Sequence, residues 1–405
     1  MAIRIRTVRS NEELAAAMGS IGHYFGWVPN AEQVESIRSY LPLDRMHAAF
    51  EDGRIVGGAG VYPFELTVPG GPLRCAGVTI VGVSPTHRRR GILRRMMTAQ
   101  LEDIREREEP FAALWASEDT IYGRYGYGAA SRCAEIKLPR VSAELRPGTP
   151  PREGEVRLVD HDEAMRTFPR IYERLRRKTP GFVLRTRDWW EKRNLDDTAE
   201  WRRAGAGPLN RALLELDGRP AGYATYRIVQ HQTEFKRSLR VIEAQGLDPR
   251  ATREIWRFLL GIDWMDDIEA RLLPLDHPIW QLVARPRLLG MTVWDGLWVR
   301  PVDVGAALNG RSYATDGRVT IDIVSDPLFE DNVGCWTIAD GRARRSTRRP
   351  DVCLDVQALG SVYLGGFTFA DLARGGRVEE SARGGIARAD ALFRTDVQPW
   401  CPEIF

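Results

Sequence analysis

The sequence of 405 residues lacks the patterns that build metal sites, disulfide frameworks and membrane spans. Its five cysteines have no CxxC or CxxH spacing, which argues against zinc and disulfides and favours a reducing, cytoplasmic location. Its six histidines show no HxxxH or HExxH spacing, so we expect no metal site. No apolar run approaches the roughly 20 residues of a membrane span. The first residues alternate like an edge strand and do not form a signal peptide.

The chain also lacks strong net charge and any motif for a covalent acyl-enzyme. A net charge of +3 does not indicate a nucleic-acid binder. No Gly-x-Ser-x-Gly elbow occurs, and Cys401 has no recognisable local partner motif. Five arginines between 342 and 349 form either a solvated cluster or a surface for nucleic acid or an acidic partner. With 43% hydrophobic and 28% charged residues, we expect a soluble globular protein of two or three domains.

One stretch combines a strand, a basic turn and the start of a helix. Residues 78–83 are mostly β-branched and apolar, which predicts a buried strand, and Pro85 ends it because proline cannot donate a ladder hydrogen bond. Three arginines and a glycine follow at 88–91, and apolar residues then recur at helical spacing. The N–H groups at a helix start bind anions, and arginines neutralise phosphate. The strongest candidate is a pyrophosphate; a solvated turn and a nucleic-acid contact are the alternatives.

The N-terminal third alternates strands and helices in a defined order. Asp52-Gly53 predicts a hairpin, and the Tyr/Gly-rich residues 120–128 predict a tight turn into a strand. The aromatic loop 23–29 is either a packed cluster or a wall of an amine pocket. The predicted order is β-α-α-β-β-β-α-β, with strands at 3–9, 45–50, 54–62 (the sheet continuing at 64–68), 73–83 and 111–116 and helices at 12–18 (with Asn11 as the N-cap), 31–40 and 91–107.

Two motifs carry a family resemblance. Arg88, Gly91 and Leu93 fill the key places of the Arg/Gln-x-x-Gly-x-Gly/Ala loop of GNAT N-acetyltransferases, with Leu93 as a departure from the pattern. The predicted element order is also the GNAT core order. Val-Ser-Pro-Thr-His-Arg-Arg-Arg-Gly-Ile-Leu at 83–93 and Ala-Ser-Glu-x-x-Ile-Tyr-Gly-Arg-Tyr-Gly-Tyr-Gly at 116–128 together resemble the Eis (enhanced intracellular survival) subfamily of these enzymes.

The resemblance implies acetyl-coenzyme A as co-substrate and assigns roles to specific residues. Tyr122 would be the general acid for the departing thiolate, and the α-carboxylate of Phe405 would be the general base. The residues that would bind the coenzyme lie on the strand, the turn and the loop after the next strand: Val81, Val83, Arg88, Arg89, Arg90, Gly91, Ile92 and Ser117.

The acceptor would be a primary amine: an aminoglycoside, a polyamine or a lysine side chain. The candidate substrate residues are Tyr24, Trp27, Ile80, Glu403 and Ile404. Ile404 stands where the subfamily can carry an acidic residue, and the 23–28 loop has no carboxylate, although Glu403 offers one. These departures weaken the expectation for aminoglycosides more than for acetyl transfer itself. The resemblance also implies a homo-hexamer, while the charge and the short apolar runs lead us to expect no nucleic-acid partner and no membrane span.

The rest of the chain divides into two further predicted domains. Residues 137–155 form a proline-rich linker, and the order of elements in 156–290 echoes the first domain. No Arg-x-x-Gly loop occurs between residues 238 and 260, where a second coenzyme site would need one. We therefore predict a mixed α/β protein: a catalytic GNAT domain at 1–138, a degenerate second GNAT-like domain at 139–292, and a sterol-carrier-protein-like α+β domain at 293–405. This third domain has either a structural role or an apolar groove for lipid.

Two alternatives to the acetyltransferase remain open from sequence. One is a non-catalytic regulator that binds acyl-coenzyme A or lipid on a GNAT scaffold; the retained Tyr122 beside a complete arginine loop favours catalysis over it. The other transfers aminoacyl groups from tRNA on tandem GNAT domains, and the near-neutral charge weighs against it.

Overall fold

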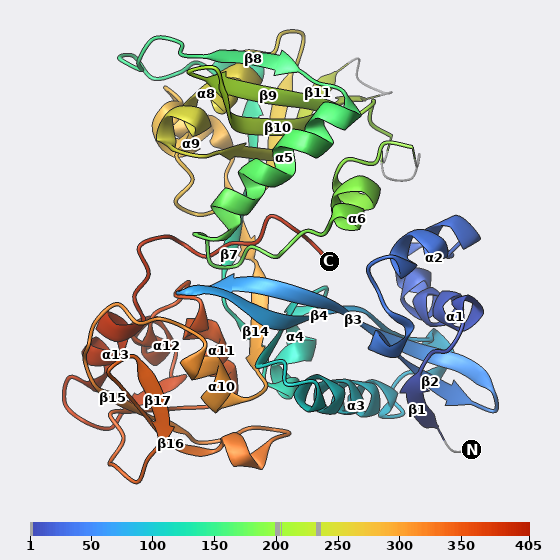
Figure 1. Cartoon of the computed structure of the whole chain (residues 1–405), viewed down its shortest axis with the longest axis vertical. Helices are drawn as coiled ribbons and strands as arrows, with labels where there is room; N and C mark the ends of the chain where they lie inside the picture. Colours follow the sequence, from blue (N-terminus) through green and yellow to red (C-terminus); the bar gives the residue numbers. More distant parts are fainter. Residues whose placement is uncertain (1–2, 199–202, 204, 232–235) are drawn as a thin grey trace. The chain divides into compact units, whose positions relative to one another are not determined.

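The computed structural model describes residues 3–198, 203, 205–231 and 236–405. The chain folds into two compact units, each built from separate stretches of sequence (Figure 1). The first unit comprises the chain up to Ser131 together with Leu297–Pro399 and Ile404–Phe405, and the second comprises Arg132–Gly296 and Trp400–Glu403. Among the described residues, no helix is long and apolar enough to cross a membrane.

A seven-stranded sheet organises the N-terminal part of the first unit, in the order β1-β2-β3-β4-β5-β14-β6. Its strands are β1 (Arg4–Thr7), β2 (Met46–Glu51), β3 (Arg54–Val68), β4 (Gly71–Val83), β5 (Phe111–Trp115), β6 (Gly128–Ala129) and β14 (Leu297–Pro301). Its helices are α1 (Asn11–Gly22), α2 (Ala31–Arg38), α3 (Ile92–Glu106) and the short α4 (Asp119–Tyr122). The predicted β-α-α-β-β-β-α-β order is thus confirmed.

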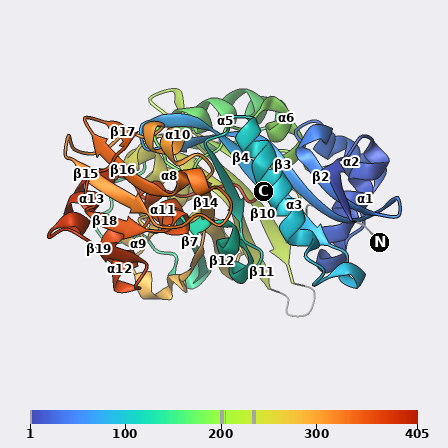
Figure 2. The ribbon, with the colours of Figure 1, turned by 90° about the horizontal axis from the view of Figure 1, so that it is seen from below.

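Adjacent glycines in β3 let helices approach both faces of this sheet. A Cβ on Gly57 would lie 3.0 Å from the side chain of Met96 in α3, whereas one on Gly58 would lie 2.6 Å from the backbone of Ala17 in α1. Successive strand residues point to opposite faces, so α3 covers one face and α1 the other (Figure 2). The Gly57-Gly58 pair therefore allows a close-packed three-layer arrangement at the centre of the sheet.

The sheet opens between β4 and β5. These two strands pair in parallel only as far as Gly77, which is opposite Ala113, and β4 then continues to Val83. A β-bulge interrupts the pairing of β4 with β3 between Thr79 and Gly82, and it contains Ile80 with a φ of +54°. Bulges re-aim backbone groups and side chains, and they occur often beside functional sites.

The second unit contains its own seven-stranded sheet, in the order β13-β7-β12-β11-β10-β9-β8. Its strands are β7 (Arg132–Pro139), β8 (Glu155–Leu158), β9 (Asn210–Leu216), β10 (Arg219–Gln230), β11 (Arg237–Gly246), β12 (Asp267–Leu273) and β13 (Thr292–Asp295). Its helices are α5 (His161–Arg176), α6 (Arg187–Trp189), α8 (Pro249–Leu260) and α9 (Ile279–Leu282).

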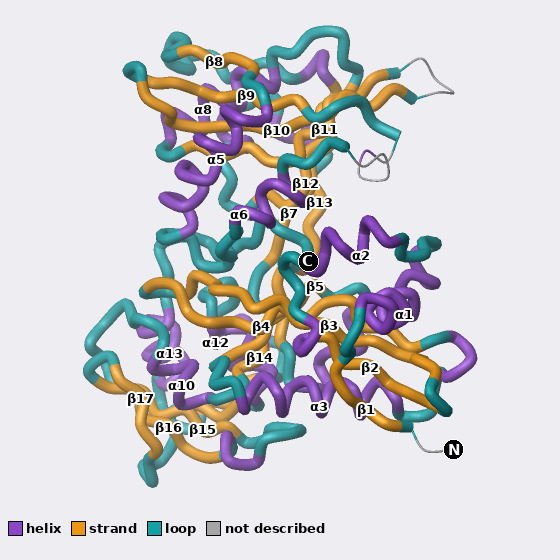
Figure 3. Tube along the Cα trace, turned by 45° about the vertical axis from the view of Figure 1, so that its right-hand side comes forward, coloured by secondary structure: helices purple, strands orange, loops and turns teal. Residues whose placement is uncertain are grey.

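The main helices of the second unit also lie on opposite faces of its sheet (Figure 3). Leu213 of β9 packs in the cluster that contains Phe168 of α5, while its neighbour Leu214 packs in the cluster that contains Trp256 of α8. Because consecutive strand residues alternate between faces, α5 and α8 sandwich the sheet. This arrangement repeats that of α1 and α3 in the first unit.

Consecutive strands of the chain belong to different sheets at two places. β6 lies in the first sheet and β7, which follows it, in the second; β13 lies in the second sheet and β14, which follows it, in the first. β14 pairs with both β5 and β6. The sequence alone places residues 297–301 in the predicted third domain at 293–405 and gives no signal for their pairing with β5.

The C-terminal part of the first unit has a five-stranded sheet, in the order β17-β16-β15-β18-β19. Its elements are α10 (Val304–Asn309), β15 (Val319–Ile323), β16 (Gly334–Ala339), β17 (Arg342–Arg345), β18 (Val352–Leu354), α11 (Val356–Tyr363), α12 (Phe369–Arg374), β19 (Val378–Glu380) and α13 (Gly385–Phe393). One buried cluster joins the helices to the sheet, with Phe369 and Leu359 among its fully buried members.

Several predicted elements need correction. The N-cap of α1 is Ser10, not Asn11, because the Ser10 hydroxyl accepts a hydrogen bond from the Glu13 N–H. The sequence pattern at 187–195 predicts one helix, whereas the chain forms a short α-helix at Arg187–Trp189 that continues as a π-helical turn over Trp190–Asn194. The short elements α12, β17 and β19 have no strong periodicity in the sequence that would predict them.

Candidate functional site

The basic turn forms an open helix start, as the sequence predicts. Gly91 precedes α3 with a φ of +75°, and a Cβ added there would meet no heavy atom within 4 Å. No described side chain caps this helix, and its first turn has no acidic residue. The N–H groups of Ile92 and the next residues therefore face an uncovered region, which favours an anion.

The three arginines of the turn have different environments. Arg88 and Arg89 are exposed and form no ion pair with any residue that the structure describes. Arg90 instead pairs with Glu51 on β2, and the same carboxylate lies 2.9 Å from Nε2 of His87. Two cations thus remain for a phosphate, while Arg90 and His87 fasten the turn to the β2–β3 hairpin.

The aromatic loop after α1 contacts the end of β4. The Tyr24 hydroxyl donates a hydrogen bond of 2.7 Å to the carbonyl of Val83, and the Arg88 guanidinium lies 6.0 Å from the centre of the Tyr24 ring. Trp27 is half-buried, and its backbone N–H closes the loop by donating to the Gly22 carbonyl at 3.0 Å. The loop therefore brings Tyr24 to the residue that precedes the basic turn, and Trp27 holds the loop in shape.

The bulge in β4 exposes backbone at the point where the sheet is open. Val81 packs against the α3 side of the sheet, as Val78 does, although the two are three residues apart. The extra residue in the bulge, Ile80, restores this facing direction. Val83 packs on the same side. The backbone from Ile80 to Val83 thus runs along the opening between β4 and β5, where no β5 residue pairs with it.

Tyr122 is buried at the end of α4, on the α3 side of the sheet. It packs in the cluster that contains Ala76 and Val78 of β4, and its ring meets that of Tyr127 edge-on at 6.1 Å. Its hydroxyl interacts with the side chain of Ser117, which is exposed in the loop after β5. Burial raises the pKa of Tyr122 above its ordinary value, so the phenol stays protonated at neutral pH and can donate a proton.

The last residue of the chain, Phe405, lies on the other face of β4. Its ring centre is 4.9 Å from that of Phe64 and 6.5 Å from that of Tyr62, both on β3. A Cβ added to Gly77 would lie 3.4 Å from Cε2 of Phe405. Gly77 is the last β4 residue that pairs with β5, so Phe405 covers the point where the sheet opens. Tyr122 and Phe405 are therefore associated with opposite faces of β4 beside this opening.

The two residues before Phe405 have contrasting environments. Ile404 is exposed, whereas Glu403 is buried in the second unit. The Glu403 carboxylate pairs with Arg185 at 2.7 Å and with Arg193 at 3.3 Å, and it accepts a hydrogen bond from Asn194 at 3.1 Å. These partners lower the pKa of Glu403 despite its burial, which keeps it ionised. The assignment of Glu403 and Ile404 to substrate binding stays a prediction, and two arginines already neutralise Glu403.

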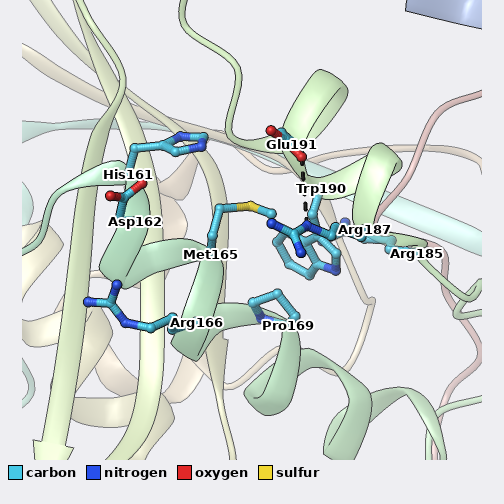
Figure 4. Close-up of a pocket in the computed structure, with 9 residues that line it drawn as sticks. All are labelled: His161, Asp162, Met165, Arg166, Pro169, Arg185, Arg187, Trp190 and Glu191. Carbon is cyan, nitrogen blue, oxygen red and sulfur yellow. Dashed lines mark ion pairs between the residues drawn. The ribbon is translucent and has the colours of Figure 1, made fainter. Parts of the chain in front are cut away.

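The second unit also has a pocket of about 500 Å³ between α5 and the segment 185–191 (Figure 4). Arg166 on α5 contributes a cation, and Arg187 pairs with Glu191 at 3.8 Å on the other side. The lining residues are His161, Asp162, Met165, Arg166, Pro169, Arg185, Arg187, Trp190 and Glu191. The charges are mixed, so the lining does not select one class of ligand.

The start of α8 in the second unit differs from the start of α3. The Asp248 carboxylate caps α8 by accepting a hydrogen bond from the Ala251 N–H at 2.8 Å. An anion at this helix start would meet the Asp248 carboxylate, and the arginines of the first turns, Arg250 and Arg253, both pair with Glu153. The second unit therefore has the topology of the first without its uncapped helix start.

Sequence reasoning missed the residues that hold the predicted site together. Phe64 and Tyr62 receive Phe405, Glu51 fixes the basic turn, and Arg185 holds Glu403. None of them belongs to a motif, because each acts on a residue distant in sequence. The local signal for a surface that binds Phe405 is a strand with two aromatic residues at alternate positions, Tyr62 and Phe64.

Comparisons with known proteins agree with this arrangement. Models described as Acetyltransferase (GNAT) domain match residues 4–130 and 181–301, and a model described as Sterol carrier protein domain matches residues 304–402. The fold and these matches define two GNAT acetyltransferase domains followed by a sterol-carrier-protein domain. The predicted fold class is therefore confirmed.

Relatives cover nearly the whole chain. An uncharacterised N-acetyltransferase of Streptomyces coelicolor is 37% identical over 419 residues, across 100% of both chains. The N-acetyltransferase Eis of Mycobacterium tuberculosis is 36% identical over 383 residues, which are 90% of each chain. The crystal structure of Eis1 from Mycobacterium abscessus matches with a TM-score of 0.85 at 35% identity, over 99% of this chain and 100% of that one. The chain belongs to the Eis family of GNAT N-acetyltransferases. This membership makes it an acyltransferase and favours the enzymatic prediction over a non-catalytic regulator.

Proposed function

We propose that this enzyme transfers the acetyl group of acetyl-coenzyme A directly to a primary amine. Tyr122 acts as the general acid, and the α-carboxylate of Phe405 acts as the general base. The observation that carries the proposal is the packing of Phe405 over Gly77, where β4 and β5 part, with Tyr122 associated with the other face of β4. Base and acid then act from opposite sides of the opened sheet.

The coenzyme is held by the basic turn and by β4. The free N–H groups at the start of α3 and the exposed Arg88 and Arg89 bind its pyrophosphate. The backbone of Ile80–Val83, which β5 leaves open, binds the pantetheine arm and polarises the thioester carbonyl. Arg90, which pairs with Glu51, contributes to the coenzyme site by fixing the turn that carries Arg88 and Arg89. Ser117 orients the Tyr122 hydroxyl.

Transfer proceeds through a tetrahedral centre. The acceptor reacts as the neutral amine; the Phe405 carboxylate takes one proton from its nitrogen as that nitrogen forms a bond to the thioester carbon. The C–S bond then breaks, and Tyr122 donates its proton to the departing thiolate. The products are the N-acetyl amine and the free thiol of the coenzyme. Solvent returns a proton to Tyr122 and removes one from Phe405.

The acceptor is a primary amine in a site with aromatic walls. Tyr24 and Trp27 provide aromatic surface, and the loop that carries them has no carboxylate. Glu403 is already neutralised by arginines. The small number of free carboxylates in this loop and tail supports an acceptor with a single charge, such as a lysine side chain, ahead of the highly cationic aminoglycosides, with polyamines as a further acceptor class to test. The domain limits 1–138, 139–292 and 293–405 and the hexameric assembly remain part of this proposal.

The test is to extend the chain by one alanine after Phe405 and to measure thiol release with a panel of aminoglycosides, polyamines and lysine peptides. The extension removes the α-carboxylate from its position, so kcat should fall about a hundredfold or more. Binding of acetyl-coenzyme A, measured by calorimetry, should not change. An extension of one alanine before Met1 is the matched control. Full turnover by the C-terminally extended enzyme would exclude the Phe405 carboxylate as the base.

A further inference from the structure

We infer that the second GNAT domain anchors the C-terminal tail through a buried ion pair between Arg185 and Glu403, and thereby positions the carboxylate of Phe405. This inference rests on the proposed function, in which that carboxylate is the base. The anchor would give the second GNAT domain, whose α8 start is capped by Asp248, a role in the reaction. Arg185 and Glu403 are positioning residues here, since they act on the reacting amine only through the tail.

Arg185 is held rigidly in the second unit. Its side chain is 1% exposed, and its Nη1 donates to the carboxylate of Glu243 on β11 at 2.9 Å. Its guanidinium carbon lies 4.0 Å from the centre of the Tyr172 ring and 4.7 Å from that of the Trp190 ring. A guanidinium clamped in this way has little freedom, so the Glu403 carboxylate, 2.7 Å from its Nε, meets a positive charge that is fixed in place.

Glu403 is one of four buried or half-buried charged groups, two carboxylates and two guanidinium groups, whose charges balance. Glu243 and Glu403 share Arg185, and Arg193 supplies the second positive charge. Two carboxylates around one guanidinium would repel each other without that second cation. Removal of the Glu403 charge would leave an unbalanced cation in a buried place. The tail therefore completes an electrostatic arrangement that the rest of the second unit leaves incomplete.

The backbone before Glu403 is fixed as well. The Trp400 N–H donates to the Pro180 carbonyl at 3.1 Å, and the Trp400 ring packs edge-on against Phe182 at 5.0 Å. Gly181 has a φ of +99°, and a Cβ there would lie 2.4 Å from the Trp400 carbonyl oxygen. The tail thus crosses a glycine that leaves room for its backbone. Cys401 adds a hydrogen bond of 3.2 Å from its Sγ to the Glu403 carbonyl.

The anchor lies where the second sheet opens, as Phe405 does in the first. β11 pairs in parallel with β12 only up to Val241, and Glu243 follows a bulge two residues later. Its partner Arg185 stacks on Tyr172 of α5, so Glu243 faces the α5 side of the sheet. Phe405 similarly lies on the α1 side, the face to which Gly58 and Gly77 point. Equivalent surfaces of two related domains thus hold two residues of one tail.

Anchoring matters because Glu403 is only two residues from the carboxylate. Once Glu403 is fixed, only the backbone dihedrals of the last residues remain free, so few positions are open to the α-carboxylate. A base displaced by about 1 Å costs about a hundredfold in rate. The packing of the Phe405 ring and the anchor at Glu403 together define where the carboxylate lies.

The experiment uses the full-length enzyme and its Glu403→Gln variant, with Glu379→Gln as the matched control. Glu379 is an exposed residue of β19. Two readouts are taken: the rate at which carboxypeptidase Y releases Phe405 from the native protein, and kcat with the best amine. Asn194→Ala, which removes one hydrogen bond to Glu403 without unbalancing charge, is a second and milder variant.

We expect Glu403→Gln to speed the release of Phe405 at least tenfold and to lower kcat about tenfold to a hundredfold, with an unchanged affinity for acetyl-coenzyme A. Asn194→Ala should give smaller changes in the same direction, and Glu379→Gln none. Slow release of Phe405 from both Glu403→Gln and Asn194→Ala would overturn the anchor, whether kcat falls or not. Fast release with unchanged kcat would uphold the anchor and overturn the proposed base, so the two failures are distinguishable.

Discussion

Phe405 packs edge-on against Phe64, with ring centres 4.9 Å apart and an interplanar angle of 79°. This contact joins the last residue of the chain to the strand beside the opening of the first sheet. Aromatic pairs in this geometry contribute about 0.5–1.5 kcal/mol beyond their buried area. A terminus held in this way is ordered, whereas most chain ends fray. The Phe405 ring therefore has a defined place beside this opening.

Replacing Gly77 by alanine tests that place. The new Cβ would lie 2.4 Å from Cδ2 of Phe64, so the ring must move and Phe405 with it. We expect a loss of stability of about 1–3 kcal/mol and a lower kcat, measured by urea unfolding and thiol release. Gly19→Ala is the control, because a Cβ there meets only Pro29 at 3.9 Å. Equal kcat in the two variants would show that Phe405 can shift without loss of function.

Replacing Tyr122 by phenylalanine tests the general acid. The ring keeps its packing, but the thiolate loses its proton donor, so kcat should fall about a hundredfold with little change in the KM for acetyl-coenzyme A. Tyr125→Phe is the matched control, since Tyr125 is also buried in the same cluster. A similar small effect of both substitutions would remove Tyr122 from the mechanism.

The same tyrosine predicts the alkaline limb of the pH profile. Burial raises the pKa of Tyr122, so the protonated form that donates persists up to and beyond the ordinary tyrosine pKa of about 10. For the wild type, we expect no loss of kcat from this group between pH 7 and pH 9. A drop centred below pH 9 that disappears in Tyr122→Phe would show that the phenol is more acidic than its burial implies.

Replacing Arg88 by alanine tests the anion site at the start of α3. A lost charge-assisted hydrogen bond costs about 1.5–3 kcal/mol, so the Kd for coenzyme A should rise about tenfold or more. The effect should be weaker for dephosphorylated fragments that lack the pyrophosphate. Arg342→Ala on β17 removes an exposed arginine from another domain and serves as the control. Unchanged affinity in Arg88→Ala would place the pyrophosphate elsewhere.

The anchor at Glu403 also predicts how stability depends on pH. Its partners hold the pKa of Glu403 below the ordinary glutamate value, so the ion pair stabilises the fold fully above about pH 4.3. That stabilisation is lost as pH falls through the lowered pKa. In urea unfolding, the free energy of unfolding of the wild type should exceed that of Glu403→Gln by about 3 kcal/mol at pH 7. This difference should become smaller below pH 4. A difference independent of pH would mean that packing, not charge, accounts for it.

The sequence by itself determined the local parts of this protein. The β-branched run at 78–83, the arginines and Gly91 defined a strand, a basic turn and a helix start, because strand and helix signals and anion binding at helix starts depend on neighbours in sequence. The element order of the first domain followed for the same reason. The predicted roles of Tyr122 and Phe405 came from the family resemblance, and the experiments above address them.

Only the tertiary structure decided the relationships between distant residues. It placed β14 beside β5, Phe405 on Phe64, and Glu403 against Arg185, 218 positions apart in the chain. Such contacts depend on how sheets exchange strands and how buried charges find partners, and no local pattern encodes either. In the sequence, a glutamate near the end of a chain has no feature that separates it from a solvated residue. Glu403 gains its role because the fold buries it beside Arg185 and Arg193, whose positive charges need a carboxylate there.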